Sequence, residues 1–206
     1  MAMEESVFCL KRADLDSLLG ERGDSTAIAD LLALPQYFLP RNRAENDPSY
    51  KQLIPYQLFR RDDGFFVYQR GKKVGEQRLA GRLSLGIGGH INSDDAGNVL
   101  LSPQTYQEAL HRERCEELAG LPPCDPLFIG LINDDSDAVS AVHLGAVHLS
   151  ILPPEADPTI RGAGEDLQPR GFWTAAAIKQ AASQFERWSL LALALAEHFS
   201  HNNPNE

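Results

Sequence analysis

The feature that most constrains this chain is a short acidic helix expected between Ser102 and Gly120. Ser102 followed by Pro103 predicts a helix start, because a serine hydroxyl can cap an amide that lacks a helical partner and proline's fixed φ suits the first turn. Gly120 followed by Pro122 and Pro123 predicts the end. The residues between these signals are therefore expected to form one uninterrupted helix.

Three glutamates share one face of this expected helix. Glu113 lies three residues before Glu116 and four before Glu117, and side chains at these spacings are neighbours on a helix surface. Like charges placed together repel, and they repel more strongly in a partly dry site unless a cation lies among them. Carboxylate oxygens are hard ligands that suit Mg²⁺ or Mn²⁺ better than zinc. Two interpretations follow: a metal site, or a solvated acidic face balanced by Arg112 and Arg114.

A glycine-rich turn precedes the helix. Residues 82–87 are expected to form a strand that leads into Gly88-Gly89-His90-Ile91. Glycine lets the backbone adopt positive φ or approach a ligand closely. Residues 92–101 are expected to form an extended loop over the site.

The order Arg112-Glu113-x-x-Glu116-Glu117 after this turn resembles the Nudix box, G-x5-E-x7-R-E-U-x-E-E-x-G-U, in which U is aliphatic. The chain also resembles the group of Nudix proteins described as predicted phosphoesterases, through residues 50–56, 84–92, 130–135 and 142–145. The resemblance spans roughly residues 45 to 150, which is most of the chain.

The box is altered at several positions. Gly89 and Arg112 are separated by 23 positions instead of 14, so nine extra residues lie between the turn and the helix. Arg114 stands at an aliphatic position, and Gly120 comes one place late. Counting forward from Gly89 puts Asp95 at the first glutamate, whereas counting back from Arg112 reaches Gln104; Asp95 is the better chemical substitute.

The resemblance implies hydrolysis of a phosphorylated small molecule with Mg²⁺, or Mn²⁺, as the cofactor. It implies that Glu113, Glu116 and Glu117 bind the metal and that the carbonyl of Gly89 is a further ligand. Glu113 and Glu117 are expected to be catalytic, with Glu113 as a candidate base. Arg112 is expected to support catalysis by holding carboxylates with charge-assisted hydrogen bonds.

Candidates for binding substrate lie outside the acidic helix. His90 follows the glycine turn and can contact phosphate, although a structural hydrogen bond explains it equally well. Arg70 and Arg78 can hold phosphate groups, and surface ion pairing is the alternative. Asp134 and Asp135 can supply a late carboxylate, although a turn role is the more common use of such residues.

Composition limits the partners and the compartment. A net charge of −10 and a pI near 5.0 argue against unassisted binding to nucleic acid or to anionic membranes. The three cysteines show no disulfide or zinc spacing, which suits a reducing compartment. The N-terminal residues have no export signal, and the longest apolar run, residues 190–196, is too short to span a bilayer. A cytoplasmic protein is therefore expected.

Strand and helix signals together predict an α+β chain. Residues 52–60 and 65–70 are expected to be strands joined by the turn Asp62-Asp63-Gly64, and residues 173–199 show the apolar period of a long helix. This order agrees with the α/β/α sandwich with a mixed central sheet that the Nudix resemblance implies. We expect a single Nudix-like domain over residues 1–206, divided into an N-terminal extension (1–48), a core (49–152) that contains the box (89–120), a loop (153–171) and a C-terminal helix (172–199).

The sequence therefore predicts a metal-dependent phosphohydrolase of the Nudix type. Its substrate is expected to be a small molecule with a phosphoanhydride or phosphoester bond, linked to or related to a nucleoside diphosphate. The alternative is a catalytically silent Nudix module that binds a nucleotide-like ligand for regulation, which the altered box favours. The resemblance also implies a homodimer.

Overall fold

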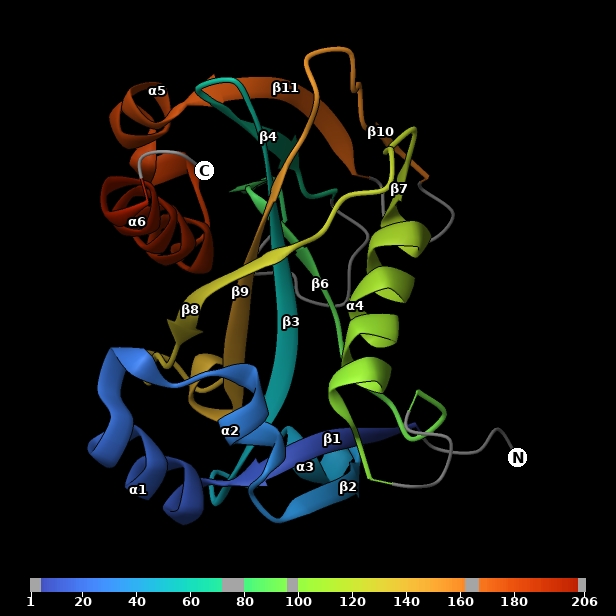
Figure 1. Cartoon of the computed structure of the whole chain (residues 1–206), viewed down its shortest axis with the longest axis vertical. Helices are drawn as coiled ribbons and strands as arrows, with labels where there is room; N and C mark the ends of the chain where they lie inside the picture. The colour runs from blue at the N-terminus through green and yellow to red at the C-terminus, as the bar shows by residue number, and fades with distance from the viewer. Residues whose placement is uncertain (1–4, 72–79, 96–99, 162–166, 204–206) are drawn as a thin grey trace. The chain divides into compact units, whose positions relative to one another are not determined.

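The computed structural model describes residues 5–71, 80–95, 100–161 and 167–203 (Figure 1). The chain divides into two compact units, each built from three segments. The first unit contains residues 1–56, 88–112 and 130–147, and the second contains residues 57–87, 113–129 and 148–206. Strands β3 (Tyr50–Arg61) and β9 (His143–Ile151) and helix α4 (Pro103–Glu117) run from one unit into the other.

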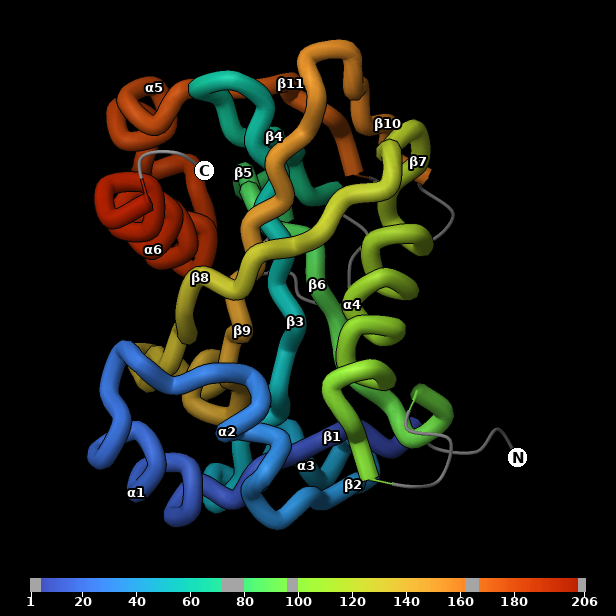
Figure 2. The backbone as a smooth tube through the Cα atoms, viewed as in Figure 1, coloured from blue at the N-terminus to red at the C-terminus, as the bar shows by residue number. Residues whose placement is uncertain are grey.

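The first unit begins with a strand that has a partner on each side. Strand β1 (Ser6–Lys11) pairs antiparallel with β2 (Gln36–Pro40), and it pairs with the start of β3, where Cys9 lies opposite Gln52. Helices α1 (Arg12–Arg22), α2 (Ile28–Leu32) and α3 (Arg41–Ala44) follow in the same N-terminal part of the chain (Figure 2). Because β1 pairs with both β2 and β3, residues 1–48 contribute two strands to the sheet.

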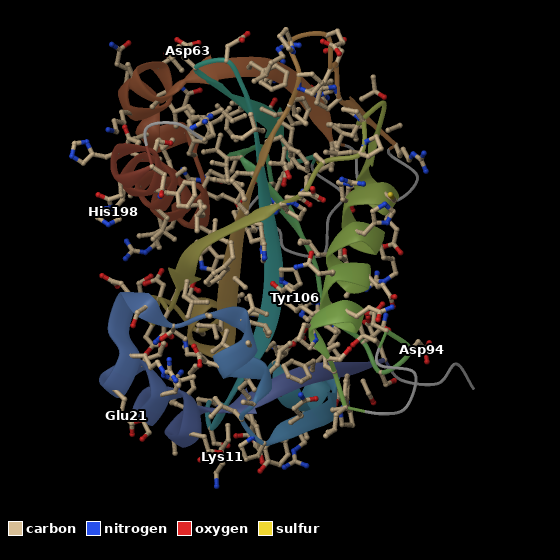
Figure 3. The ribbon with its side chains drawn as sticks, in the orientation of Figure 1. Lys11, Glu21, Asp63, Asp94, Tyr106 and His198 are labelled. Atoms are coloured by element: carbon tan, nitrogen blue, oxygen red, sulfur yellow. The ribbon has the colours of Figure 1, made fainter. Side chains whose placement is uncertain are left out.

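The second unit is built around strand β4 (Gly64–Gln69), which pairs antiparallel with β3, β5 (Leu83–Ser84) and β11 (Gln168–Thr174). The expected hairpin between β3 and β4 is present: Arg61 lies opposite Gly64, and Asp62 has a φ of 54°. Asp63 marks the tip of this hairpin (Figure 3). One core cluster of this unit consists of Phe59, Phe66, Tyr68, Ile87, Leu118, Leu152, Ala156 and Leu167.

The predictions of a loop over 153–171 and a single helix over 172–199 were wrong. Within 153–171, strand β10 (Thr159–Ile160) pairs with β7 (Leu118–Ala119), and β11 begins at Gln168. The expected helix is instead the end of β11, helix α5 (Ala175–Gln180), a 3-10 turn and helix α6 (Arg187–Asn202). The apolar period continues across these breaks because both helices bury one face, but Thr174 and Glu186 are extended and start each helix anew.

The box segment matches its prediction at the start of the helix. The Ser102 hydroxyl accepts a hydrogen bond from the Thr105 amide at 3.2 Å, and the Thr105 hydroxyl accepts one from the Ser102 amide at 2.7 Å. Helix α4 then runs to Glu117, with Tyr106 fully buried and pointing to the interior of the first unit (Figure 3). The remaining strands are β6 (Gly86–Gly88) and β8 (Leu127–Ile132). Within the described residues, no helix has the length and apolar character that crossing a bilayer requires.

Candidate active site

The glycine turn is a place of close backbone approach. A side-chain Cβ at Gly88 would lie 2.1 Å from the carbonyl oxygen of Pro55, so only glycine allows β6 to lie against β3 at this point. Beyond the turn, the Phe8 amide donates to the Ile91 carbonyl at 2.8 Å and the Ser93 amide donates to the Ser6 carbonyl at 3.0 Å. The chain that leaves the turn is therefore attached to β1.

Arg112 is held by a carboxylate in the loop after the turn. Its Nε and Nη2 each donate to one oxygen of Asp95 at 2.8 Å, and Nη2 also donates to the carbonyl of His90 at 3.1 Å. The Asp95 side chain is 9% exposed and also accepts a hydrogen bond from the Asn92 amide. This bidentate pair connects the turn, the loop and α4 within the first unit.

The pair between Arg112 and Asp95 explains how the box tolerates its insertion. Asp95 lies six positions after Gly89, which is the spacing of the box's first glutamate, and 17 positions before Arg112, where the box has eight. The nine extra residues therefore all fall between Asp95 and the arginine. The sequence identified Asp95 as a substitute for the glutamate; the structure adds that its partner is Arg112, which agrees with the expectation that this arginine holds a carboxylate.

The three box glutamates occupy the last turns of α4, in the second unit. Glu113 and Glu117 are half-buried and Glu116 is exposed. Burial raises the pKa of the nearby Tyr68 hydroxyl to about 12, and the negative charge of Glu117 acts in the same direction. The helix end is fixed, because the amide of Arg161 donates to the Glu117 carbonyl at 2.9 Å.

The three glutamates suit a divalent metal ion in the chemistry of their oxygen atoms and in their spacing along the helix. They offer hard oxygen donors, as Mg²⁺ and Mn²⁺ require, on one and a half turns of one helix. Among the residues that the structure describes, no three His, Cys, Asp or Glu side chains are gathered closely enough to hold an ion. Gly89 belongs to the first unit and the glutamates to the second, so ligation by its carbonyl stays a prediction.

His90 lies against a second histidine. The Nε2 atoms of His90 and His143 are 3.4 Å apart, and Nδ1 of His143 is 2.7 Å from the Val139 carbonyl oxygen. Burial first, and then the charges of Arg41 and His143, together lower the pKa of His90 to about 3. His90 is therefore neutral near pH 7, and it can contact phosphate only as a neutral donor or acceptor.

Arg70 has a buried partner that the sequence did not reveal. Its Nε donates to Oε2 of Glu186 at 3.1 Å, and Oε1 of Glu186 accepts hydrogen bonds from the hydroxyls of Ser84 at 2.5 Å and Ser189 at 3.1 Å. Glu186 is separated from Arg70 by 116 positions, so no local pattern indicates the pair. Substrate binding by Arg70 stays a prediction, and Arg78 lies outside the described residues.

Asp135 forms an ion pair with the buried Lys51 and so has a structural role. The Lys51 side chain is 0% exposed, and its Nζ donates to Asp135 at 2.8 Å. Arg12 donates to both oxygens of the same carboxylate at 2.9 and 3.2 Å. Hydrogen bonds from Arg12 and then Lys51 lower the pKa of Asp135 to about 2. The cluster attaches the segment after β8 to β3 and α1 within the first unit.

Comparison with known proteins identifies the relatives of this chain. Protein YmaB of Bacillus subtilis (strain 168) is 31% identical over an alignment of 212 positions, which covers 95% of this chain and 98% of YmaB. The crystal structure of Tm1382, a predicted Nudix hydrolase, superposes with a TM-score of 0.75 and 25% identity over 95% of this chain and all of that one. The chain belongs to the Nudix hydrolases, in one family with YmaB.

A more distant relative shares the fold alone. A Nudix hydrolase from Nitrosomonas europaea superposes with a TM-score of 0.50 and 14% identity, over 72% of this chain and 89% of that one. A scan for family models gave no match. The expectations of a Nudix-like fold with a mixed central sheet and of membership of the Nudix hydrolases are confirmed.

Proposed function

We propose that this Nudix protein is a phosphohydrolase that depends on Mg²⁺ and cleaves a phosphoanhydride or phosphoester bond in a small molecule related to a nucleoside diphosphate. The observation that carries the proposal is the bidentate pair of Arg112 and Asp95. Although the box is altered, this pair keeps the arginine bound to a carboxylate at the box's own distance from Gly89, and the metal-binding glutamates follow directly on the same helix.

Glu113, Glu116 and Glu117 would hold the metal, with Mn²⁺ as an alternative ion. When bound, such an ion neutralises charge on phosphoryl oxygens and lowers the pKa of water. Glu113 directly follows Arg112 in the sequence, and its side chain is half-buried. It is the candidate base that takes the proton from the attacking water. Arg112 would not contact the substrate itself. By hydrogen bonding to Asp95 and to the His90 carbonyl, it orients the helical turn that carries the glutamates.

The alternative function is a silent module that binds a nucleotide-like ligand for regulation, and the buried Arg114 within the box favours it. Robust turnover that requires Mg²⁺ would exclude this alternative, whereas tight ligand binding without turnover would support it. A cytoplasmic location and a homodimer remain further parts of the proposal, to be checked by fractionation and by light scattering.

The test is hydrolysis of a panel of nucleotide sugars, dinucleotides and nucleoside triphosphates, with Mg²⁺, with Mn²⁺ and with EDTA. Glu117→Gln should abolish turnover while it preserves the fold. Glu108→Gln is the matched control, because Glu108 is an exposed glutamate on the same helix whose carboxylate accepts only a neutral hydrogen bond, from Gln104. Turnover that survives in Glu117→Gln at the level of the control would remove the proposed mechanism.

A further inference from the structure

Arg114 is a buried charge at a position where the Nudix box has an aliphatic residue. The residue is 8% exposed. Burying a guanidinium is unfavourable unless hydrogen bonds and a negative partner compensate for the lost water. Among the described residues, the structure pairs Arg114 with no carboxylate, and the one partner that it gives is a sulfur atom: Nη1 of Arg114 lies 3.1 Å from Sγ of Cys124.

Cys124 combines this partner with access to solvent. It follows Pro122 and Pro123 in the segment after β7, and it is partly exposed. One side of the residue packs against the core cluster around Phe59. Cysteines that react in proteins lie in partly exposed, electropositive surroundings, and cysteines buried among apolar groups are inert.

The other two cysteines provide the contrast within the same chain. Cys9 is fully buried in β1, and burial raises the pKa of its thiol to about 12. Cys115 is partly buried on α4. Cys124 differs from the buried Cys9 in that an arginine side chain donates a hydrogen bond to its sulfur.

We propose that Cys124 is a site of reversible oxidation by hydroperoxides, with Arg114 as the residue that positions its sulfur. The sulfur attacks the outer oxygen of the peroxide, so that an S–O bond forms as the O–O bond breaks. The oxygen that leaves takes the thiol proton and becomes water or an alcohol. The cysteine is oxidised by two electrons to the sulfenic acid, and the peroxide is reduced by two.

The guanidinium suits both the thiol and its product. Its five N–H donors lie in one plane, so a second donor can bind the oxygen that oxidation adds while Nη1 stays near the sulfur. A sulfenic acid returns to the thiol when a small thiol condenses with it and the resulting disulfide is reduced. This site does not depend on the proposed hydrolase function, because neither Arg114 nor Cys124 is among the proposed metal ligands.

The experiment treats the full-length protein with hydrogen peroxide, without metal or substrate, and traps sulfenic acid with a 1,3-dicarbonyl reagent. Mass spectrometry of the three cysteine peptides over time gives a rate for each. The Cys124 peptide should be labelled fastest, the Cys115 peptide more slowly, and the Cys9 peptide not at all. Labelling should disappear after treatment with a small thiol and a reductant.

Arg114→Leu restores the apolar residue type of the box and should slow labelling of Cys124 by about tenfold, the factor that one weak charge-assisted hydrogen bond represents. Arg22→Leu is the control, since Arg22 is an exposed arginine on α1 paired with Asp30. Arg114→Lys covers the case in which the leucine variant does not fold; it keeps the charge, loses the planar fork, and should label at an intermediate rate. Cys124 labelling no faster than Cys115, or unchanged in the folded Arg114 variants, would overturn the proposal.

Discussion

The two halves of the box segment use charge in different ways. In the half before Glu113, Arg112 and Asp95 form a bidentate pair with side chains 30% and 9% exposed, and backbone hydrogen bonds attach the same loop to β1. In the half from Glu113 to Glu117, three like charges follow one another on the last turns of α4. The charges of the first half bind one another, whereas the glutamates of the second half are the proposed metal ligands.

The largest expected effect comes from substituting the glutamates at the end of α4. Glu117→Gln and Glu113→Gln should each lower kcat by about 10³-fold or more, as removal of a group that stabilises transition-state charge does. The free energy of unfolding should change far less than the activation free energy, because side-chain pairs on a helix surface contribute about 0.5 kcal/mol or less each. Steady-state kinetics and urea unfolding measure the two quantities. A loss of stability as large as the loss of activity would mean that these glutamates are structural.

For Asp95 and Arg112, in the half of the box segment before Glu113, we expect a loss of stability. Asp95→Ala leaves the Arg112 guanidinium partly buried without its carboxylate, and it should lower the free energy of unfolding by about 2 kcal/mol, below the range for fully buried pairs because Arg112 retains some solvent. The double variant with Arg112→Ala should cost less than the sum of the single variants. Asp94→Ala is the matched control, since Asp94 is an exposed aspartate in the same loop. Additive effects of Asp95 and Arg112 would show that the pair contributes no coupling.

The contrast also explains what the sequence could reveal. Helix α4 was predicted well because its start depends on adjacent residues, Ser102 and Pro103, and Asp95 was found because its spacing from Gly89 is short. The partners of Arg70 and Lys51 are 116 and 84 positions away, and only the folded sheet brings them together. The C-terminal region was misassigned for the same reason: β11 is a strand because it pairs with β4, about a hundred residues earlier in the chain.

A smaller effect tests how far the structural half extends toward the helix start. Ser102→Ala removes the hydroxyl that accepts from the Thr105 amide, and it should lower the free energy of unfolding by about 1 kcal/mol, the usual value of a helix cap. Ser183→Ala, at an exposed serine of the 3-10 turn before α6, is the control and should change little. Since the cap lies far along α4 from the glutamates, kcat should stay near that of the parent protein. A large loss of activity with little loss of stability would contradict the division between the two halves.

The smallest effect concerns the pH dependence of stability, and it tests the ion pairs that Asp135 makes within the first unit. The pKa of Asp135 is lowered to about 2, so its pairing stabilises the fold fully above the unfolded pKa of about 4, and this contribution is lost as pH falls from there toward 2. The contribution should be about 1 kcal/mol or less, because the Asp135 side chain is 54% exposed and water screens the interaction. Urea unfolding of the parent protein and of Asp135→Asn should differ most near pH 6 and converge near pH 2. A parallel pair of pH profiles for the parent protein and Asp135→Asn would mean that the carboxylate's charge does not stabilise the first unit.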